Sequence, residues 1–408
     1  MLNHEIVEVT LLEEAWNSDY RARRSTDSNL PDRLTFAIPV ARDKAVIRMT
    51  RSKLLPVVMS DGESTRAANS FSEDASVFTD LSSCASMIVR RQSGSYMLRG
   101  TFVHQDVAWI LHYETRHQRD VHQVTGMPHL ISPYMAPNIS NVGERHTERM
   151  IDNIIWHVIF STESTTLNTE NNTAQPDREG EEIDPSSERP TRHVVEIAFI
   201  VDFEDYCKWV KYVGMENTVS EMRLWYTFVA ESINIRYQNI KDPDIAISTT
   251  VTVLRILNET DNANLFPNCK NTSVLIGEES LESLQIWYQN QDDLPTSDHY
   301  MLFTGLNLVS NQHGDIYGNA FLGTLCTVSS VSVVENDFNE NVGHTCTHEL
   351  AHSMSSDHDE ENSKETKCDP DNLYIMSGYG SMPVDPAKEG NTWKFSPCSI
   401  ASFKSYLR

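Results

Sequence analysis

The stretch His348–Asp359, with the sequence HELAHSMSSDHD, restricts the fold of this chain more than any other. His348 and His352 are four residues apart, so on a helix they share one face and can bind one metal ion. His358 reaches the same ion only if the helix ends and the chain turns back. Three neutral imidazoles leave a fourth tetrahedral position open for water, which is typical of a catalytic zinc site. Glu349, beside the first histidine, is placed to take a proton from that water.

A second sequence feature separates this pattern from an accidental one. By chance, HExxH occurs in roughly one chain in a hundred of this length, where it marks only a polar helix with solvated histidines. Here Tyr374–Tyr379 (YIMSGY) follows, with Met376 placed 18 residues after His358. That stretch resembles the Met-turn of the metzincin metalloproteases, in which a methionine forms a hydrophobic floor beneath the zinc ligands. Asp359, directly after the third histidine, resembles the adamalysin or reprolysin (ADAM-like) family.

The resemblance to this family extends over residues 193–408 and is weaker before them. His193–Asp202 resembles the first strand of the catalytic domain, Asp298–Gly305 the strand that leads to the cleft, and Gly318–Cys326 the substrate-binding edge strand. An α/β fold is implied, with a mainly parallel twisted sheet, an active-site helix and the Met-turn. Residue patterns independently predict helices over 219–240, 278–291, 337–354 and 396–407, and strands over 194–202, 245–257, 300–308 and 319–326.

The expected edge strand gives a candidate substrate site. Gly318, Ala320 and Leu322 would hold an extended peptide by main-chain hydrogen bonds, as in strand addition. From the residues alone, a plain core strand is the alternative. The family places its specificity pocket near the Met-turn, so residues 377–382 are expected to line it.

One position in the helix-ending turn departs from the family. Relatives commonly have glycine seven residues after the first histidine, whereas this chain has Ser355. If that residue needs a positive φ, a serine costs on the order of 1 kcal/mol relative to glycine. We expect a modest strain and an intact site.

Six of the seven cysteines follow residue 193, and an even number in one segment fits three disulfides of a secreted protein. The alternative is six buried thiols. Family resemblance suggests that Cys326 pairs with Cys398. Two further pairs, Cys346 with Cys368 and Cys207 with Cys269, are guesses, since six cysteines allow 15 pairings.

The resemblance also suggests a structural calcium ion. Glu196 and Asp298 occupy the positions of the family's carboxylate ligands. The position three residues after Cys398, often asparagine in relatives, is Ala401 in this chain. Ordinary salt-bridged carboxylates are therefore the alternative for Glu196 and Asp298.

Charge and hydropathy exclude several classes of protein. The net charge of −25 argues against nucleic-acid binding, because phosphates would be repelled. No apolar run approaches 18 residues, so no membrane span is expected. Residues 1–8 lack the basic start and apolar core of a signal peptide. The cysteines and sequons nevertheless predict a secreted protein, which we expect to be a monomer.

Three parts follow one another along the chain. Residues 1–160 alternate short apolar runs with turns, for example at 45–49, 86–89 and 109–113, which predicts a mostly β domain that loosely resembles the family's prodomain. Residues 161–192 are too polar to fold and form an expected acidic linker. It ends in Arg189-Pro190-Thr191-Arg192, the minimal site of furin-type convertases, so we expect maturation cleavage after Arg192. Residues 193–408 form the catalytic domain.

The predicted protein is a secreted zinc metalloendopeptidase, made as a zymogen, that hydrolyses peptide bonds of extracellular proteins. No cysteine lies between Cys84 and Cys207, so the prodomain thiolate that many relatives place shortly before the cleavage point is absent here. Cys84 is expected to be a structural or unpaired thiol of the prodomain, and zinc ligation by Cys84 is the alternative. Without such a thiolate, the prodomain would block the cleft sterically. The alternative function is a catalytically weak binding or decoy module. Intact Glu349 favours the enzyme.

Overall fold

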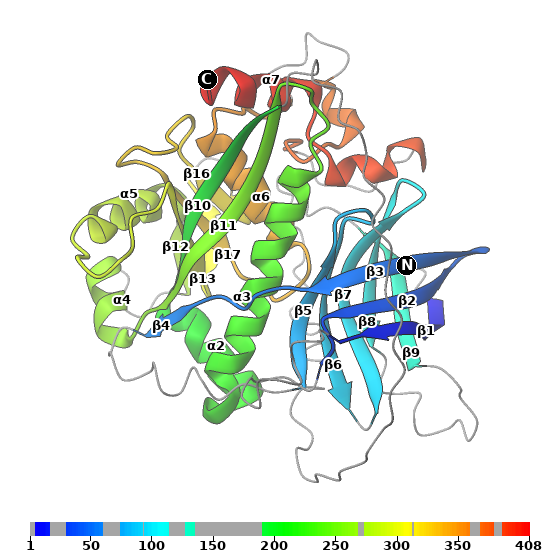
Figure 1. The fold of residues 1–408 in the computed structure, drawn as a ribbon. Helices are drawn as coiled ribbons and strands as arrows, with labels where there is room; N and C mark the ends of the chain where they lie inside the picture. The colour runs from blue at the N-terminus through cyan, green and yellow to red at the C-terminus, as the bar shows by residue number, and fades with distance from the viewer. Residues whose placement is uncertain are drawn as a thin grey trace.

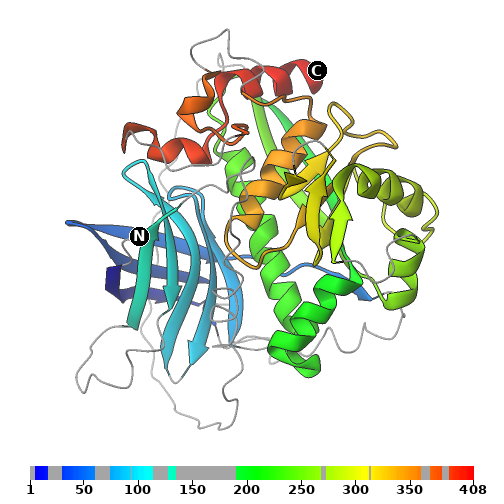
Figure 2. The same cartoon turned by 180° about the vertical axis from the view of Figure 1, so that it is seen from behind.

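The structure is a computed structural model, which describes residues 5–16, 30–59, 74–92, 94–113, 127–134, 190–267, 273–311, 314–359, 368–378 and 386–408. It contains an N-terminal β-barrel and a larger α/β unit, with the long helix α3 (Met215–Gln238) between them (Figures 1 and 2). Most of the expected linker, residues 161–189, lies outside the described residues. Its last two residues belong to a strand that begins at Thr191.

Eight strands of the N-terminal part close into a barrel. Neighbouring strands are antiparallel, and alternate residues such as Ala45, Ile47 and Met49 point into its core. The three strands expected from apolar alternation in this part are confirmed. The barrel strands are β1 (Glu5–Ala15), β2 (Arg33–Val40), β3 (Asp43–Arg51), β5 (Ala75–Asp80), β6 (Ala85–Gln92), β7 (Ser95–His104), β8 (Val107–Tyr113) and β9 (Met127–Pro133).

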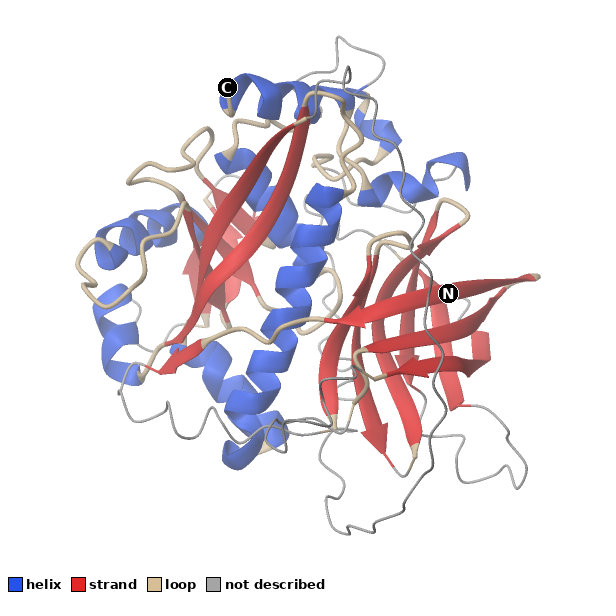
Figure 3. Ribbon diagram, in the orientation of Figure 1, coloured by secondary structure: helices blue, strands red, loops and turns tan. Residues whose placement is uncertain are grey.

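The α/β unit is built on a six-stranded sheet whose strand order is β16-β17-β13-β10-β11-β4. All neighbours are parallel except β16, which runs antiparallel to β17, so the expected mainly parallel sheet is confirmed. Helices cover the sheet (Figure 3). The strands are β4 (Val57–Met59), β10 (Thr191–Val201), β11 (Ile245–Ile256), β13 (His299–Thr304), β16 (Gly318–Ala320) and β17 (Val331–Glu335).

The structure contains the four helices expected from the sequence pattern, adds two that were not expected, at 203–213 and 259–265, and divides one expected strand. A separate helix, α2 (Phe203–Val213), precedes α3 and ends at Gly214, whose φ is 78°. The strand expected over 300–308 divides into β13 and β14 (Asn307–Ser310), and β14 joins a small second sheet with β12 (Val274–Ile276) and β15 (Gly314–Asp315). The other helices are α4 (Glu259–Leu265), α5 (Gly277–Tyr288), α6 (Val342–Ser353) and α7 (Pro397–Tyr406).

The final helix begins as its sequence predicts. Ser396 is the N-cap and accepts a hydrogen bond from the Ser399 amide, and Pro397 occupies the first helical position. Among the described residues, no helix is both long enough and apolar enough to cross a lipid bilayer.

A buried histidine in β13 makes the stability of the fold depend on pH. His299 is fully buried between the hydroxyls of Ser330 and Ser332, at 3.1 and 2.8 Å, and burial lowers its pKa to about 3. In the unfolded chain this histidine gains a proton below pH ~6.5. Between about pH 3 and pH 6.5 the unfolded state binds a proton that the folded state does not. The contribution of neutral His299 to stability is therefore fully present above pH 6.5 and is lost as the pH falls below that value.

We therefore expect protonation of His299 in the unfolded chain to lower the free energy of unfolding by about 2 kcal/mol as the pH falls from 7 to 5. Urea titrations at both pH values measure this difference. His299→Gln, which keeps a hydrogen-bonding side chain but does not titrate, should reduce the difference by that amount. His193→Gln, at a partly exposed histidine of β10, is the control and should leave it unchanged. Equal pH dependence in the parent and His299→Gln would contradict the prediction.

Candidate metal centre

The turn that follows α6 places the third histidine beside the first two. The helix carries His348 and His352, and its C-cap is Met354. Ser355 then adopts φ 67°, and its amide donates to the His352 carbonyl at 2.8 Å. The turn therefore needs the left-handed conformation, and the serine there carries the modest strain expected from the sequence.

The three histidines converge on one point. The Nε2 atom of His348 lies 3.1 Å from that of His352 and 3.1 Å from that of His358, and the last two are 3.2 Å apart. Among the described residues, this is the one group of histidine, cysteine and acidic side chains close enough to hold a metal ion. The structure thus brings together the ligands that the sequence predicted.

Backbone carbonyls orient the imidazoles. His348 Nδ1 lies 2.8 Å from the Ile375 carbonyl, and His352 Nδ1 lies 2.8 Å from the Ser356 carbonyl. A carbonyl only accepts, so each Nδ1 carries the proton and each Nε2 presents a lone pair. Burial, and then the neighbouring imidazoles, hold the pKa of His348 well below its usual range, and burial lowers that of His352 to about 3. Both rings are therefore neutral.

This arrangement fits zinc. Nitrogen ligands at about 2.0–2.1 Å around a tetrahedral zinc lie roughly 3.3 Å from one another, close to the separations observed here. Lone pairs that face each other at such distances repel unless a cation lies between them. Three imidazole nitrogens that leave a fourth position open for water are the donor set of a catalytic zinc site.

Glu349 lies beside the ligands in a closely packed position. Its side chain is 3% exposed, and burial raises the pKa of its carboxyl to about 8. A Cβ atom placed on Gly318 of β16 would be 2.5 Å from Glu349 Oε1. The absence of a side chain at Gly318 therefore leaves the space that the carboxyl occupies.

Met376 and Asp359 are joined by a backbone hydrogen bond next to the third histidine. Met376 is fully buried in a turn, and its carbonyl accepts from the Asp359 amide at 3.0 Å. The carboxylate of Asp359 accepts from Ser396 Oγ at 2.6 Å. The residue after His358 thus links the third ligand to the Met376 turn and to the start of α7. The sequence did not reveal this role of Ser396.

Comparison with known proteins agrees with this geometry. A model of the Reprolysin (M12B) family zinc metalloprotease matches residues 200–408, which include all three histidines and Met376. The chain belongs to the reprolysin family. The family's domain therefore occupies about half of the chain, from within β10 to residue 408. The barrel lies outside the matched residues.

Relatives of this reprolysin are longer proteins. It is 31% identical over 207 residues to the hemorrhagic metalloproteinase-disintegrin-like kaouthiagin of Naja kaouthia, covering 48% of this chain and 44% of the relative. It is 24% identical over 312 residues to the zinc metalloproteinase-disintegrin-like atrase-A of Naja atra, covering 76% and 42%. The chain thus spans less than half the length of these relatives.

A solved structure is also similar to this reprolysin. Metalloproteinase-II from Bacteroides fragilis matches 96% of both chains with a TM-score of 0.36 and 11% identity. At these values the likeness adds nothing to the family assignment, which depends on the family model.

The edge strand of the reprolysin is shorter than expected. Only Gly318–Ala320 pairs with β17, because the chain then turns through Gly323 and Cys326, whose φ values are 66° and 62°. Leu322 lies beyond the strand and is 48% exposed. The prediction of a strand to Cys326 is therefore wrong, while substrate binding by Gly318, Ala320 and Leu322 stays a prediction. Most of the expected pocket, residues 379–382, lies outside the described residues.

Two predicted disulfides are wrong. Cys398 pairs with Cys368, with the Cα atoms 6.1 Å apart, and not with Cys326. Cys326 is an exposed thiol, and Cys346, on α6, is a fully buried thiol in the protease core. The third predicted pair includes Cys269, which lies outside the described residues.

The expected calcium site stays a prediction. The side chain of Asp298 accepts hydrogen bonds from the Glu196 amide at 2.9 Å and from Cys326 Sγ at 3.4 Å. These contacts join the middle of β10 and Cys326 to the residue that precedes β13. The Asp298 carboxylate therefore has a structural partner in the chain itself.

Gly318→Ala should lower kcat/KM on peptides by about 10-fold or more, because the new methyl group would displace the Glu349 carboxyl from the metal centre. Steady-state assays measure this loss, and zinc content should not change. Gly314→Ala is the control, since a Cβ there meets nothing within 4 Å although its φ of 76° makes the substitution strained. An active Gly318→Ala enzyme would show that Glu349 needs no such space.

Proposed function

We propose that this reprolysin is a secreted zinc metalloendopeptidase that hydrolyses extracellular proteins and is made as a zymogen. The observation that carries the proposal is the convergence of three histidine Nε2 atoms beside the buried Glu349. The Reprolysin family model and relatives named as metalloproteinases support it.

Each part of the centre has a distinct task in this proposal. When bound, zinc would polarise the scissile carbonyl and make a water nucleophilic near neutral pH. His348, His352 and His358 would hold the ion through Nε2, with the rings of His348 and His352 fixed at Nδ1 by backbone carbonyls. Glu349, held in its ionised form by the nearby cation, would accept the proton of the attacking water and return it to the leaving amine. The exposed main chain of Gly318–Ala320 would pair with an extended substrate.

Secretion and maturation rest on separate observations. The Cys368–Cys398 disulfide fits an oxidising compartment. Arg192, the proposed furin-type site, is exposed but pairs with Ala246 at the start of β10, so cleavage would require the first residues of β10 to leave β11. Cys84 is buried close to Tyr134 and Trp393, and this supports a structural role for its thiol rather than zinc ligation.

Incubating the full chain with a peptide library tests the proposed activity. We expect defined cleavage products by mass spectrometry, loss of these products with a zinc chelator, and their return when zinc is added back. An exposed peptide bond in an extended segment should be the preferred target. Products that persist in chelator would exclude a zinc endopeptidase, and no products from zinc-loaded protein would favour the binding module.

A further inference from the structure

A strand from the N-terminal part completes the sheet of the protease domain. β4 pairs in parallel with Leu254–Ile256 at the edge of the six-stranded sheet, and the Leu254 amide donates to the Pro56 carbonyl at 2.8 Å. Figure 1 shows the segment between β3 and β4 leaving the barrel and crossing α3, so that β4 lies beside β11. Val57 packs into the core on one face of the sheet and Val58 against the core on the other. β4 is therefore a built-in sheet strand and not a surface contact.

Helix α3 holds the segment that leads to β4. The Leu55 amide donates to Thr227 Oγ1 at 3.1 Å, and the Leu55 carbonyl accepts from Arg223 Nε at 2.5 Å. The side chain of Leu55 is 7% exposed and belongs to the protease core. Both polar groups of this backbone position are thus satisfied by the protease domain.

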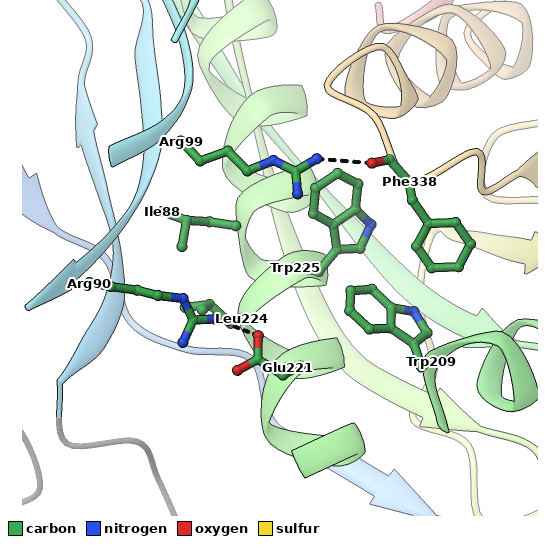
Figure 4. A pocket seen from close by; sticks show the side chains of 8 residues that line it. All are labelled: Ile88, Arg90, Arg99, Trp209, Glu221, Leu224, Trp225 and Phe338. Carbon is green, nitrogen blue, oxygen red and sulfur yellow. Dashed lines mark hydrogen bonds and ion pairs between the residues drawn. The ribbon is translucent and has the colours of Figure 1, made fainter. Parts of the chain in front are cut away.

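A buried charge pair joins the barrel to the loop before the zinc helix. Arg99 of β7 donates from Nε to Glu340 at 2.7 Å and from a terminal nitrogen to the Phe338 carbonyl at 2.9 Å (Figure 4). Its guanidinium lies over the Trp225 ring at 5.0 Å. The side chains of Arg99 and Glu340 are 5% and 3% exposed, and His112 Nε2 lies 3.4 Å from the same carboxylate. Separation would leave two opposite charges without partners.

The last described residue of the barrel side is also anchored. Tyr134 is 4% exposed and packs against Trp393 at 5.8 Å and His344 at 6.3 Å. Arg236 covers the Trp393 ring at 3.7 Å. The chain is therefore attached to the protease domain immediately before the segment that leads to β10.

The interface between barrel and protease domain is closely packed. A cavity of about 10 Å³ remains between them, which is no more than the space of one water. Arg90 forms an ion pair with Glu221 of α3 at its edge. The other lining residues are Ile88, Arg99, Trp209, Leu224, Trp225 and Phe338.

We propose that the barrel is a permanent, non-covalently bound subunit of the mature protease. Cutting the chain between residues 134 and 190 would leave the two pieces joined, because release would expose the edge of β11, the protease core around Val57 and the charge of Glu340. The partner that fits this surface is the chain's own residues 5–134. The proposal concerns association alone and does not depend on hydrolytic activity.

The test uses the full chain with Glu349→Ala, so that self-digestion cannot confuse the result. The recognition sequence of a specific protease replaces part of residues 161–189, and the cut protein is analysed by size exclusion at micromolar concentration and by mass photometry at nanomolar concentration. We expect both pieces to remain together at the mass of the uncut chain and to separate only in denaturant. A barrel that elutes alone in native buffer would overturn the proposal.

Two pairs of variants examine the contacts themselves. Val57→Asp and Arg99→Met should each weaken association of the cut pieces by about 100-fold or more. Val46→Asp, at an exposed barrel position, and Arg51→Met, which removes a pair with Asp32 inside the barrel, should behave like the parent. Each variant is first checked uncut for a cooperative unfolding transition. Folded interface variants whose cut pieces associate as tightly as those of their controls would contradict the proposal. The association of the two pieces of the cut parent protein tests the proposal independently of these variants.

Discussion

Glu349→Ala should lower kcat/KM on peptide substrates by about 10²–10⁴-fold while one zinc ion per chain is retained. The loss follows from removing the group that accepts the proton of water. Retention follows from the geometry of the ligands, whose rings are oriented by the carbonyls of Ile375 and Ser356 and not by Glu349. Steady-state kinetics and elemental analysis of the dialysed protein measure the two quantities.

The free energy of unfolding of the variant distinguishes a catalytic role of Glu349 from a structural one. The carboxyl is buried, and burial raises its pKa to about 8, so the fold carries a desolvation cost at this position. Replacement by alanine should leave the unfolding free energy unchanged or higher. Glu204→Ala, at an exposed position of α2, is the matched control and should alter neither rate nor stability. A variant at Glu349 that hydrolyses peptides within a few-fold of the parent would exclude the general-base role.

Local sequence spacing predicted the metal centre well. The spacing of four positions from His348 to His352 fixes one helical face, whatever the rest of the chain does. The third ligand depends on a single turn, and the position of Ser355 marked where that turn lies. The identities of the side chains in the sequence were therefore enough to predict the three ligands. The orienting partners are backbone carbonyls, which carry no signal in the sequence.

Features that depend on distant parts of the chain could not be predicted in the same way. β4 is three residues long, and its place in the sheet is decided by a partner nearly 200 residues later in the chain. The pairing of Cys398 depends on which thiol the fold brings within reach, and the structure brings Cys368. β16 stops pairing with β17 because the chain turns at Gly323. The apolar pattern of the sequence continues past the last paired residue, so it does not show where the strand ends.

Asp359→Ala should weaken zinc binding by about 10–100-fold, although Asp359 is not a ligand. Its carboxylate accepts from Ser396 Oγ at 2.6 Å, and the same hydroxyl accepts from the Ser399 amide at 3.1 Å as the cap of α7. Removing the carboxylate loosens the residue that carries His358 into the centre and weakens the start of α7. Competition with a chromophoric chelator measures the affinity.

A matched control lies two residues away in the same turn. Asp357 is exposed, so Asp357→Ala removes the same charge near the zinc without removing the buried hydrogen bond. It should bind zinc within about two-fold of the parent, because solvent screens an exposed carboxylate. Asp359→Asn, which keeps an acceptor for Ser396, should bind more tightly than Asp359→Ala. Equal affinities for Asp359→Ala and Asp357→Ala would mean that the link to α7 does not position His358. A deficit confined to Asp359→Ala, with hydrolysis restored at saturating zinc, would assign this residue a role in holding the third ligand.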